Sequence, residues 1–165
     1  MILVKQSGKW AILDQNLKNV TDFVFTDVAV NSKNQVFSGN YAVVADENGY
    51  FLIDQKGKAC FEKRFPNAKG MEGGYYAVAD ESGQWGFADE KGELVVPCQY
   101  VDAYSFSNQT AAVQYAGKWG YINRYGNMVI DAQFSTALPF LNGKAMVQDD
   151  QENIKVLELR YFDTF

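Results

Sequence analysis

The chain has 165 residues, of which 47% are hydrophobic and 15% are aromatic, so it can bury a core and is not disordered by composition. It contains no histidine, which removes the commonest general base at neutral pH and excludes Ser-His-Asp and Cys-His catalysis. Its net charge of -5 has the wrong sign for holding a nucleic-acid backbone, so any macromolecular partner is expected to be basic.

The sequence offers no signal for a membrane, a secretory pathway or a cofactor. Its apolar runs fall well short of the roughly 18 residues that span a bilayer, and residues 1–6 lack a basic region followed by a long apolar stretch. Cytoplasmic residence is therefore the expectation. Cys60 and Cys98 are the two cysteines, and without histidine they do not make an ordinary zinc site. No metal and no cofactor are expected, and both thiols are interpreted as small half-buried hydrophobes.

Four copies of one unit follow one another along the chain, centred on Trp10, Tyr50, Trp85 and Trp119. The last two centres are 34 residues apart, and Tyr50 precedes Trp85 by 35 residues. The first copy is longer because residues 29–40 are inserted in it. Internal repetition at this period indicates a repeat architecture. The predicted domain is a single array with units at about 1–40, 41–74, 75–108 and 109–143, followed by a terminal cap at 144–165.

Each unit has the pattern of three short antiparallel strands, which in the fourth copy cover residues 111–115, 119–123 and 128–130. Residues of high β-propensity alternate within these segments, and Gly and Asn separate them. The predicted fold class is therefore all-β, an array of about four three-stranded units that is either an open solenoid or a propeller-like ring. Phe134, Ala137 and Phe140 then recur every three residues, which predicts one helical or 3₁₀ turn.

Two repeated positions carry structural expectations. Trp85 and Trp119 are predicted to be equivalent and buried, because a ring present in successive units holds the units together. Gly86 and Gly120 follow them, and a glycine inside a strand indicates a close approach to the backbone, predicted here to come from a ring of the neighbouring unit. At the end of the chain, residues 154–159 are predicted to form a capping strand with Ile154 facing inward.

The segment from residue 116 to residue 140 resembles the WG-repeat (KWG-repeat) family, which occurs widely in bacterial proteins. It carries the Gly-Lys-Trp-Gly-aromatic-Ile-Asn run and the later aromatic, Ala and Phe positions, and the copy with Val95-Val96-Pro97 is nearly as similar. The first two copies depart from the pattern, with Trp10-Ala11 and Tyr50-Phe51 in place of Trp-Gly. The resemblance implies a β-repeat fold and brings no catalytic residue with it.

Carboxylates recur in the turn between the first and second strands of several units, where the stacking of units would form an acidic edge. The candidate binding residues are Asp46, Glu47, Asp80, Glu81, Asp149 and Asp150. Paired acids can also catalyse glycoside hydrolysis, but exposed turns supply nothing that raises the pKa of one of them, so the chain is not expected to be an enzyme.

The favoured function is a non-catalytic protein-binding module, monomeric when free, whose acidic edge neutralises a basic toxin such as a nuclease, as an inhibitor or immunity protein does. One alternative is a carbohydrate or cell-surface ligand binder that uses exposed tyrosines. These are Tyr75, Tyr76, Tyr104, Tyr115 and Tyr125. Another alternative is an accessory structural module in a larger assembly.

Overall fold

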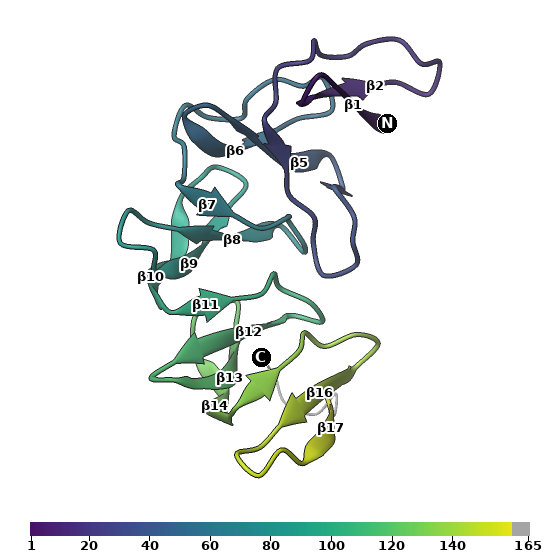
Figure 1. Ribbon diagram of the computed structural model, residues 1–165. Helices are drawn as coiled ribbons and strands as arrows, with labels where there is room; N and C mark the ends of the chain where they lie inside the picture. Colours follow the sequence, from purple (N-terminus) through teal and green to yellow (C-terminus); the bar gives the residue numbers. More distant parts are fainter. Residues whose placement is uncertain (160–165) are drawn as a thin grey trace.

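The computed structural model describes residues 1–159, which form strands and loops only (Figure 1). The strands are β1 (Ile2–Gln6), β2 (Lys9–Leu13), β3 (Asp27–Val28), β4 (Phe37–Ser38), β5 (Tyr41–Asp46), β6 (Gly49–Ile53), β7 (Asn67–Ala68), β8 (Tyr75–Ala79), β9 (Trp85–Asp89), β10 (Leu94–Tyr100), β11 (Asp102–Ala103), β12 (Thr110–Tyr115), β13 (Lys118–Asn123), β14 (Met128–Phe134), β15 (Thr136–Ala137), β16 (Lys144–Gln148) and β17 (Ile154–Glu158). Every pairing is antiparallel, which confirms the all-β prediction.

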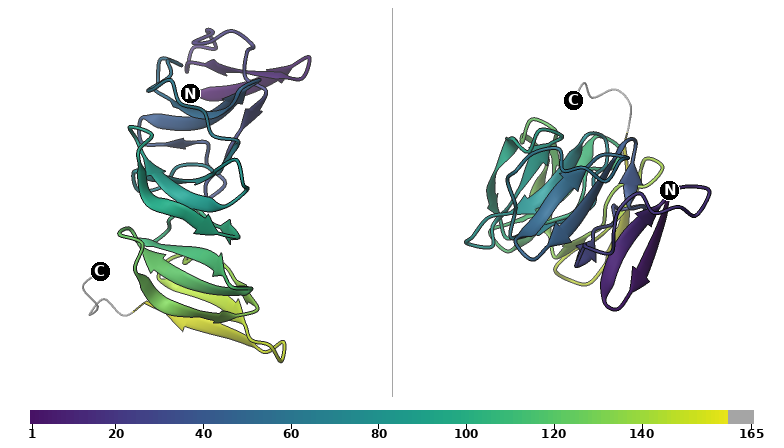
Figure 2. Two further views of the ribbon diagram at one scale, coloured as in Figure 1. Left: turned by 90° about the vertical axis from the view of Figure 1, so that its left-hand side faces the viewer. Right: turned by 90° about the horizontal axis from the view of Figure 1, so that it is seen from above.

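The strands group into five sheets that are stacked in chain order along an arc (Figure 2). The first contains β1 and β2, the second β3 to β6, the third β7 to β10, the fourth β11 to β14 and the last β15 to β17. Each of the last three sheets begins with a two-residue strand that pairs with the first strand of a hairpin. This short strand comes from the segment in which a helical turn was expected.

The helical-turn prediction is wrong, and the reason lies in how the chain passes from sheet to sheet. Phe134 ends β14, Ala137 lies in β15 of the next sheet, and Phe140 lies in the following loop. All three side chains join one buried cluster between the two sheets. The three-residue spacing therefore does not reflect the turn of a helix. It reflects a chain that crosses from one sheet to the next and places each of these side chains in the space between the two sheets.

The core fills the gaps between successive sheets. In one such gap, the Phe106 ring lies with its centroid 4.6 Å from that of Phe87, and in the next gap Phe140 lies 4.8 Å from Tyr121. Trp85 and Trp119 are each 9% exposed, so the prediction that they are equivalent and buried is confirmed. Because each cluster draws on two sheets, no sheet buries its apolar face alone.

Gly86 and Gly120, which follow Trp85 and Trp119, approach the backbone of their own sheet, and not a ring of the neighbouring unit as predicted. A Cβ atom on Gly86 would lie 2.5 Å from the carbonyl oxygen of Val96, and one on Gly120 would lie 2.6 Å from that of Ile130. Both carbonyls belong to the third long strand of the sheet, at an irregularity in its pairing with the second. The bulged strand thus bends over the glycine and leaves no space for a side chain.

The first two units, which lack this glycine, also lack the bulged third strand. In the second unit, the chain that follows β6 forms bridges with β6 only near its two ends, where Ile53 pairs with Ala59 and Tyr50 pairs with Phe65. Phe51, in the glycine position, is 5% exposed and carries the Arg64 guanidinium 3.5 Å from its ring centroid. In the second unit, where no third strand covers this position, the large Phe51 side chain occupies the space, whereas the first unit has the buried Ala11 there.

The C-terminal strand forms where it was expected, but in the opposite register. β17 pairs with β16, and Leu157 and Leu159 pack against the last buried cluster. Ile154 and Val156 are 68% and 57% exposed, so the prediction that Ile154 faces inward is wrong. A shift of one residue exchanges the two faces of a strand, and here the face that carries the leucines is the one that packs against the cluster.

Candidate functional site

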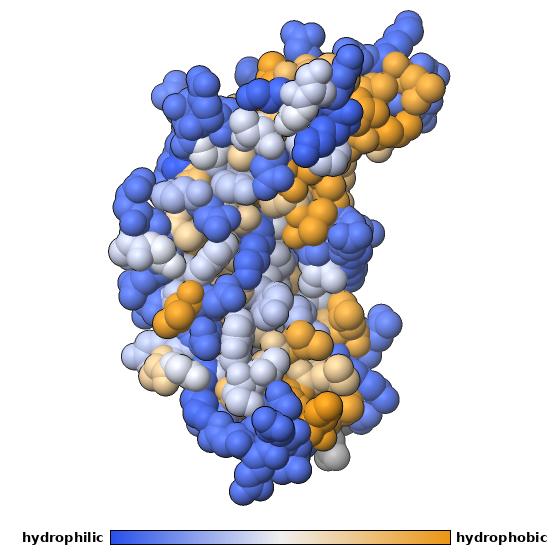
Figure 3. Space-filling view, viewed as in Figure 1, coloured by the Kyte–Doolittle hydropathy of each residue, from blue (hydrophilic) through white to orange (hydrophobic). Residues whose placement is uncertain are grey.

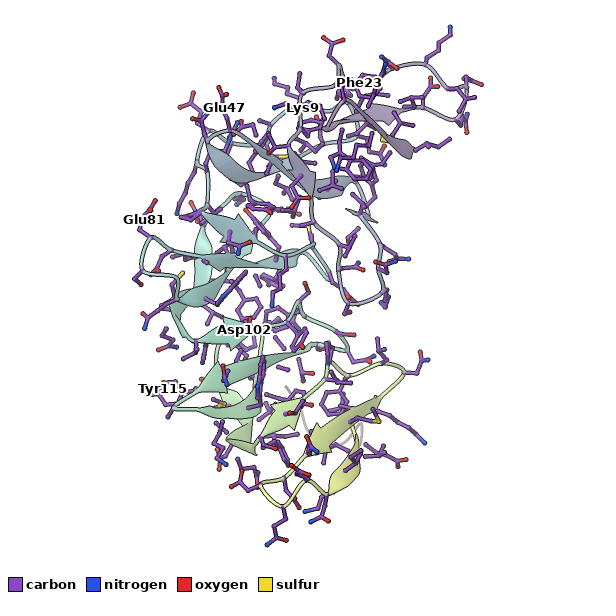
Figure 4. The ribbon with its side chains drawn as sticks, viewed as in Figure 1. Lys9, Phe23, Glu47, Glu81, Asp102 and Tyr115 are labelled. Atoms are coloured by element: carbon purple, nitrogen blue, oxygen red, sulfur yellow. The ribbon has the colours of Figure 1, made fainter. Side chains whose placement is uncertain are left out.

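The acidic turns lie at one side of the array, as the stacking of units predicted. Figure 4 places Glu47 at the β5–β6 turn, Glu81 at the β8–β9 turn and Tyr115 at the β12–β13 turn along the same side of the molecule. Figure 3 shows that this side is largely hydrophilic, whereas apolar side chains gather on the opposite, hollowed side. We call the β5–β6, β8–β9, β12–β13 and β16–β17 turns the acidic edge.

The first carboxylate of each pair shapes its own turn. Asp80 Oδ1 accepts hydrogen bonds from the backbone N–H groups of Ser82 and Gln84, at 2.9 Å and 3.0 Å. Asp149 accepts from the same two positions further along the chain, and Asp46 accepts from Asn48. An aspartate that binds backbone donors two and four residues ahead replaces the hydrogen bonds that the turn lacks. These aspartates are therefore structural, a role that the acidic pairing alone did not reveal.

The sequence does carry a signal for this role. The turn aspartate or asparagine stands three residues before a residue with positive φ, which is Gly83 after Asp80 and Gly92 after Asp89. The same arrangement holds for Asp14, Asp54, Asn123 and Asp149. Most of these turns are not in the acidic edge, so the spacing marks turn geometry and not binding.

Positive side chains neutralise part of the acidic edge. Arg64 Nε lies 3.1 Å from Asp46 Oδ2, Lys155 Nζ lies 3.0 Å from Asp149 Oδ2, and Lys118 pairs with Asp150. These three partners were not anticipated, because they lie 18, 6 and 32 residues away from the carboxylates that they pair with. Glu47 and Glu81 are exposed and form no ion pair within residues 1–159.

Two aspartates of the edge are stabilised in their charged form. A hydrogen bond from the Ser82 side chain lowers the pKa of Asp80, and Lys155 lowers the pKa of Asp149 to about 2. A general acid needs the opposite shift, towards neutral pH. What the edge can do chemically is attract cations, because its carboxylates outnumber the cations that pair with them.

An open hollow lies beside Glu47 at the N-terminal end of the edge. It has a volume of about 380 Å³ and is lined by Lys9, Phe23, Val24, Asp46, Glu47 and Asn48. Figure 4 shows Lys9, Phe23 and Glu47 near one another at the first two sheets. Most of the lining is polar, and it includes the cation Lys9, but Phe23 and Val24 form an apolar wall beside Glu47. Glu47 and this wall suit the charged end and the aliphatic stem of a lysine or arginine side chain. The apolar wall was missed from the sequence, because it comes from the connection between β2 and β3.

The acidic edge is interrupted in its third turn. Tyr115 is 50% exposed there and packs edge-on against Tyr100, with ring centroids 6.3 Å apart. Lys118, which pairs with Tyr115 across this hairpin, forms the ion pair with Asp150. Glu47 and Glu81, on the second and third sheets, form no ion pair within residues 1–159, and the same holds for Asp80 beside Glu81 and for Glu152 in the β16–β17 turn.

The five tyrosines proposed for carbohydrate binding do not form one surface. Tyr76 is fully buried, Tyr75 packs against Phe106, and Tyr104 lies 5.3 Å from the Trp119 ring. The remaining two, Tyr115 and Tyr125, are 50% and 65% exposed. Most of these rings therefore serve the core, and the alternative that relied on them as a group loses its basis.

Comparison with known proteins identifies the repeated units. Residues 85–119 and 119–152 each match the family described as WG containing repeat. These two units are WG repeats. The first match begins at Trp85, and the two matches meet at Trp119. These are the tryptophans that precede Gly86 and Gly120. The comparison with curated proteins found no match.

Solved structures share the fold of this chain at low sequence identity. The computationally designed Ika8 protein has a TM-score of 0.57 and 11% identity, with 95% of this chain and 57% of Ika8 covered. BamB from Moraxella catarrhalis has a TM-score of 0.53 and 13% identity, with 96% and 54% covered. Hsv2 from Kluyveromyces lactis has a TM-score of 0.53 and 13% identity, with 85% and 46% covered. The chain thus spans about half the length of these neighbours, and the likeness concerns fold alone.

Proposed function

We propose that this WG-repeat array is a non-catalytic, cytoplasmic module that binds a basic protein through its acidic edge and thereby neutralises it, in the manner of an immunity protein for a basic toxin. The observation that carries the proposal is the position of Glu47 and Glu81. Both are exposed, both lie at the same side of successive sheets, and neither forms an ion pair within the described residues. Charges placed in this way steer an oppositely charged partner during its approach.

The hollow beside Glu47 supports the same proposal. It places the unpaired carboxylate of Glu47 beside Phe23 and Val24, so a partner's arginine or lysine would gain apolar contact as well as charge. A cation held in a hollow at an interface loses more solvent than a charge at the rim, and it contributes more to affinity. The edge would therefore use Glu47 as an anchor and Glu81 chiefly for steering.

The test measures the association rate with the basic protein encoded by the reading frame next to this chain's gene, by stopped-flow fluorescence at low and high salt. The double variant Glu47→Lys and Glu81→Lys should slow association at least about tenfold at low salt, since electrostatic steering raises rates by 10 to 10³. Raised salt should slow the wild type in the same direction. The turn aspartates are left intact, because reversing them would disturb the turns.

The matched control is the double variant Glu90→Lys and Glu93→Lys. These two exposed carboxylates lie in the β9–β10 turn, at the other end of β9 from Glu81, and their reversal changes the net charge by the same amount. The control should associate as fast as the wild type. If both variants slow association equally, only net charge matters, and the acidic edge is a solvated face. A neighbouring product that does not bind at all contradicts the proposal.

A further inference from the structure

The insertion in the first unit, residues 29–40, docks onto the third sheet at the opposite side from the acidic edge. The Val30 carbonyl accepts a hydrogen bond from the Gly70 N–H at 3.0 Å, and Asn31 Nδ2 donates to the Met71 carbonyl at 3.2 Å. The approach is so close that a Cβ atom on Gly70 would lie 2.3 Å from Asn31 N. The corresponding residue one unit later is Ser105, so the glycine is specific to the unit that receives the insertion.

The docked insertion closes one wall of a pocket of about 220 Å³. Lys33 from the insertion, Tyr75 at the start of β8, Phe106 and Gln109 before β12, and Arg124 after β13 line it, together with Glu72, Gly73, Ser107 and Asn108. These residues come from the ends of strands that point away from the acidic edge, whose turns lie at the other ends of β8 and β12. The pocket is therefore a separate site.

One turn at this pocket holds its backbone in a costly conformation. Five hairpins within residues 1–159 have a two-residue tip with positive φ at both residues, and the second residue is glycine in all but the one at the pocket. The tips are Ser7-Gly8, Gly73-Gly74, Ala116-Gly117, Asn142-Gly143 and, at the pocket, Asn108-Gln109. Asn and Gly tolerate this conformation, whereas Gln109, with φ of 65°, does not adopt it readily. Such strain is often kept where a side chain has a function, and the Gln109 side chain lines the pocket.

The charges of the pocket favour an anionic ligand. Glu72, 8% exposed, is already satisfied, because Lys33 Nζ lies 2.6 Å from one carboxylate oxygen and Ser32 Oγ donates to the other at 2.6 Å. Arg124 forms no ion pair within residues 1–159. The pocket thus keeps a net positive charge in a chain whose total is -5. A guanidinium binds a planar carboxylate through two parallel hydrogen bonds.

The size and the aromatic wall define the rest of the ligand. Pockets for drug-sized molecules occupy about 300–1,000 Å³, and this one is smaller. Tyr75 and Phe106, with ring centroids 5.6 Å apart, offer an apolar surface to a ring or a short aliphatic body. We infer that the pocket between the insertion and the third and fourth sheets binds a small organic carboxylate with an apolar body, held by Arg124 and Gln109.

The test is a titration of the ¹⁵N-labelled chain with phenylacetate, followed by amide chemical shifts. Shifts should concentrate at Gly73, Tyr75 and Asn108. Phenethylamine has a similar apolar body and the opposite charge, and it should not bind. Acetyl-Gly-Phe, with a free C-terminal carboxylate, separates the two sources of this chemistry, since binding more than tenfold tighter than that of phenylacetate would assign the pocket to a peptide terminus.

Three variants decide which residues hold the ligand. Arg124→Gln should weaken phenylacetate binding at least tenfold, while the control Lys91→Gln, in the equivalent turn of the preceding sheet, should leave it unchanged. Gln109→Gly should weaken binding and raise the melting temperature, because it relieves the positive φ. The inference is overturned if phenylacetate causes no local shifts at roughly 10 mM, well above the millimolar affinity of a weak fragment, if phenethylamine binds equally well, or if Arg124→Gln binds as the wild type does.

Discussion

Replacing Gly86 by alanine tests why this repeat carries glycine after tryptophan. The added Cβ atom would lie 2.5 Å from Val96 O, 2.7 Å from Cys98 N and 2.8 Å from Pro97 C, all of them backbone atoms of β10. Since carbon and oxygen normally approach no closer than about 3.3 Å, the strand must move by several tenths of an ångström or more. Overpacking of this kind costs about 1–3 kcal/mol, and the upper end is expected because no flexible side chain can yield.

The assay is urea unfolding followed by tryptophan fluorescence, with Gly83→Ala as the control. Gly83 has a φ of +80° and nothing within 4 Å of its ideal Cβ position, so its substitution costs only backbone strain, about 1–2 kcal/mol. Amide shifts in Gly86→Ala should also spread along β10, whereas those in the control should stay in the turn. A Gly86→Ala protein that is at least as stable as Gly83→Ala, with unchanged shifts in β10, would refute this explanation of the Trp-Gly pair.

Two further predictions concern titratable side chains. Tyr76→Phe should be neutral or stabilising by about 1 kcal/mol, because the buried Tyr76 hydroxyl has no hydrogen-bond partner within residues 1–159. Tyr121→Phe should instead destabilise the protein by about 1 kcal/mol, because it removes the 2.7 Å hydrogen bond from the Tyr121 hydroxyl to Leu138 O. Equal unfolding midpoints for the two variants would contradict this. Carboxyl NMR should give Asp149 a pKa of about 2, and Lys155→Ala should return it towards the ordinary value of 3.8. Because the pKa of Asp149 is lower in the folded state, the associated stabilisation is present above pH 3.8 and is lost as the pH falls through about 2. A pKa near 3.8 for Asp149 in the wild type would contradict this prediction.

The sequence alone determined the class of fold, the period of the repeat and the burial of its tryptophans. These properties depend on local patterns, namely alternation along a strand, turn residues between strands and recurrence of one ring at a fixed spacing. The same reasoning brought Glu47 and Glu81 to one side of the array, because units that repeat in sequence also stack in space. The common side of these two carboxylates followed from this without any knowledge of contacts.

Tertiary structure decided which carboxylates stay unpaired and what surrounds them. Asp46 meets Arg64 and Asp150 meets Lys118 across 18 and 32 residues, distances at which no local pattern predicts an ion pair. The register of β17 was decided by which apolar residues fit the last cluster, since both faces of that strand carry them. The docking of the 29–40 insertion on Gly70 likewise depends on contact between backbone segments that are far apart in the sequence. A local sequence pattern carries no information about such a contact.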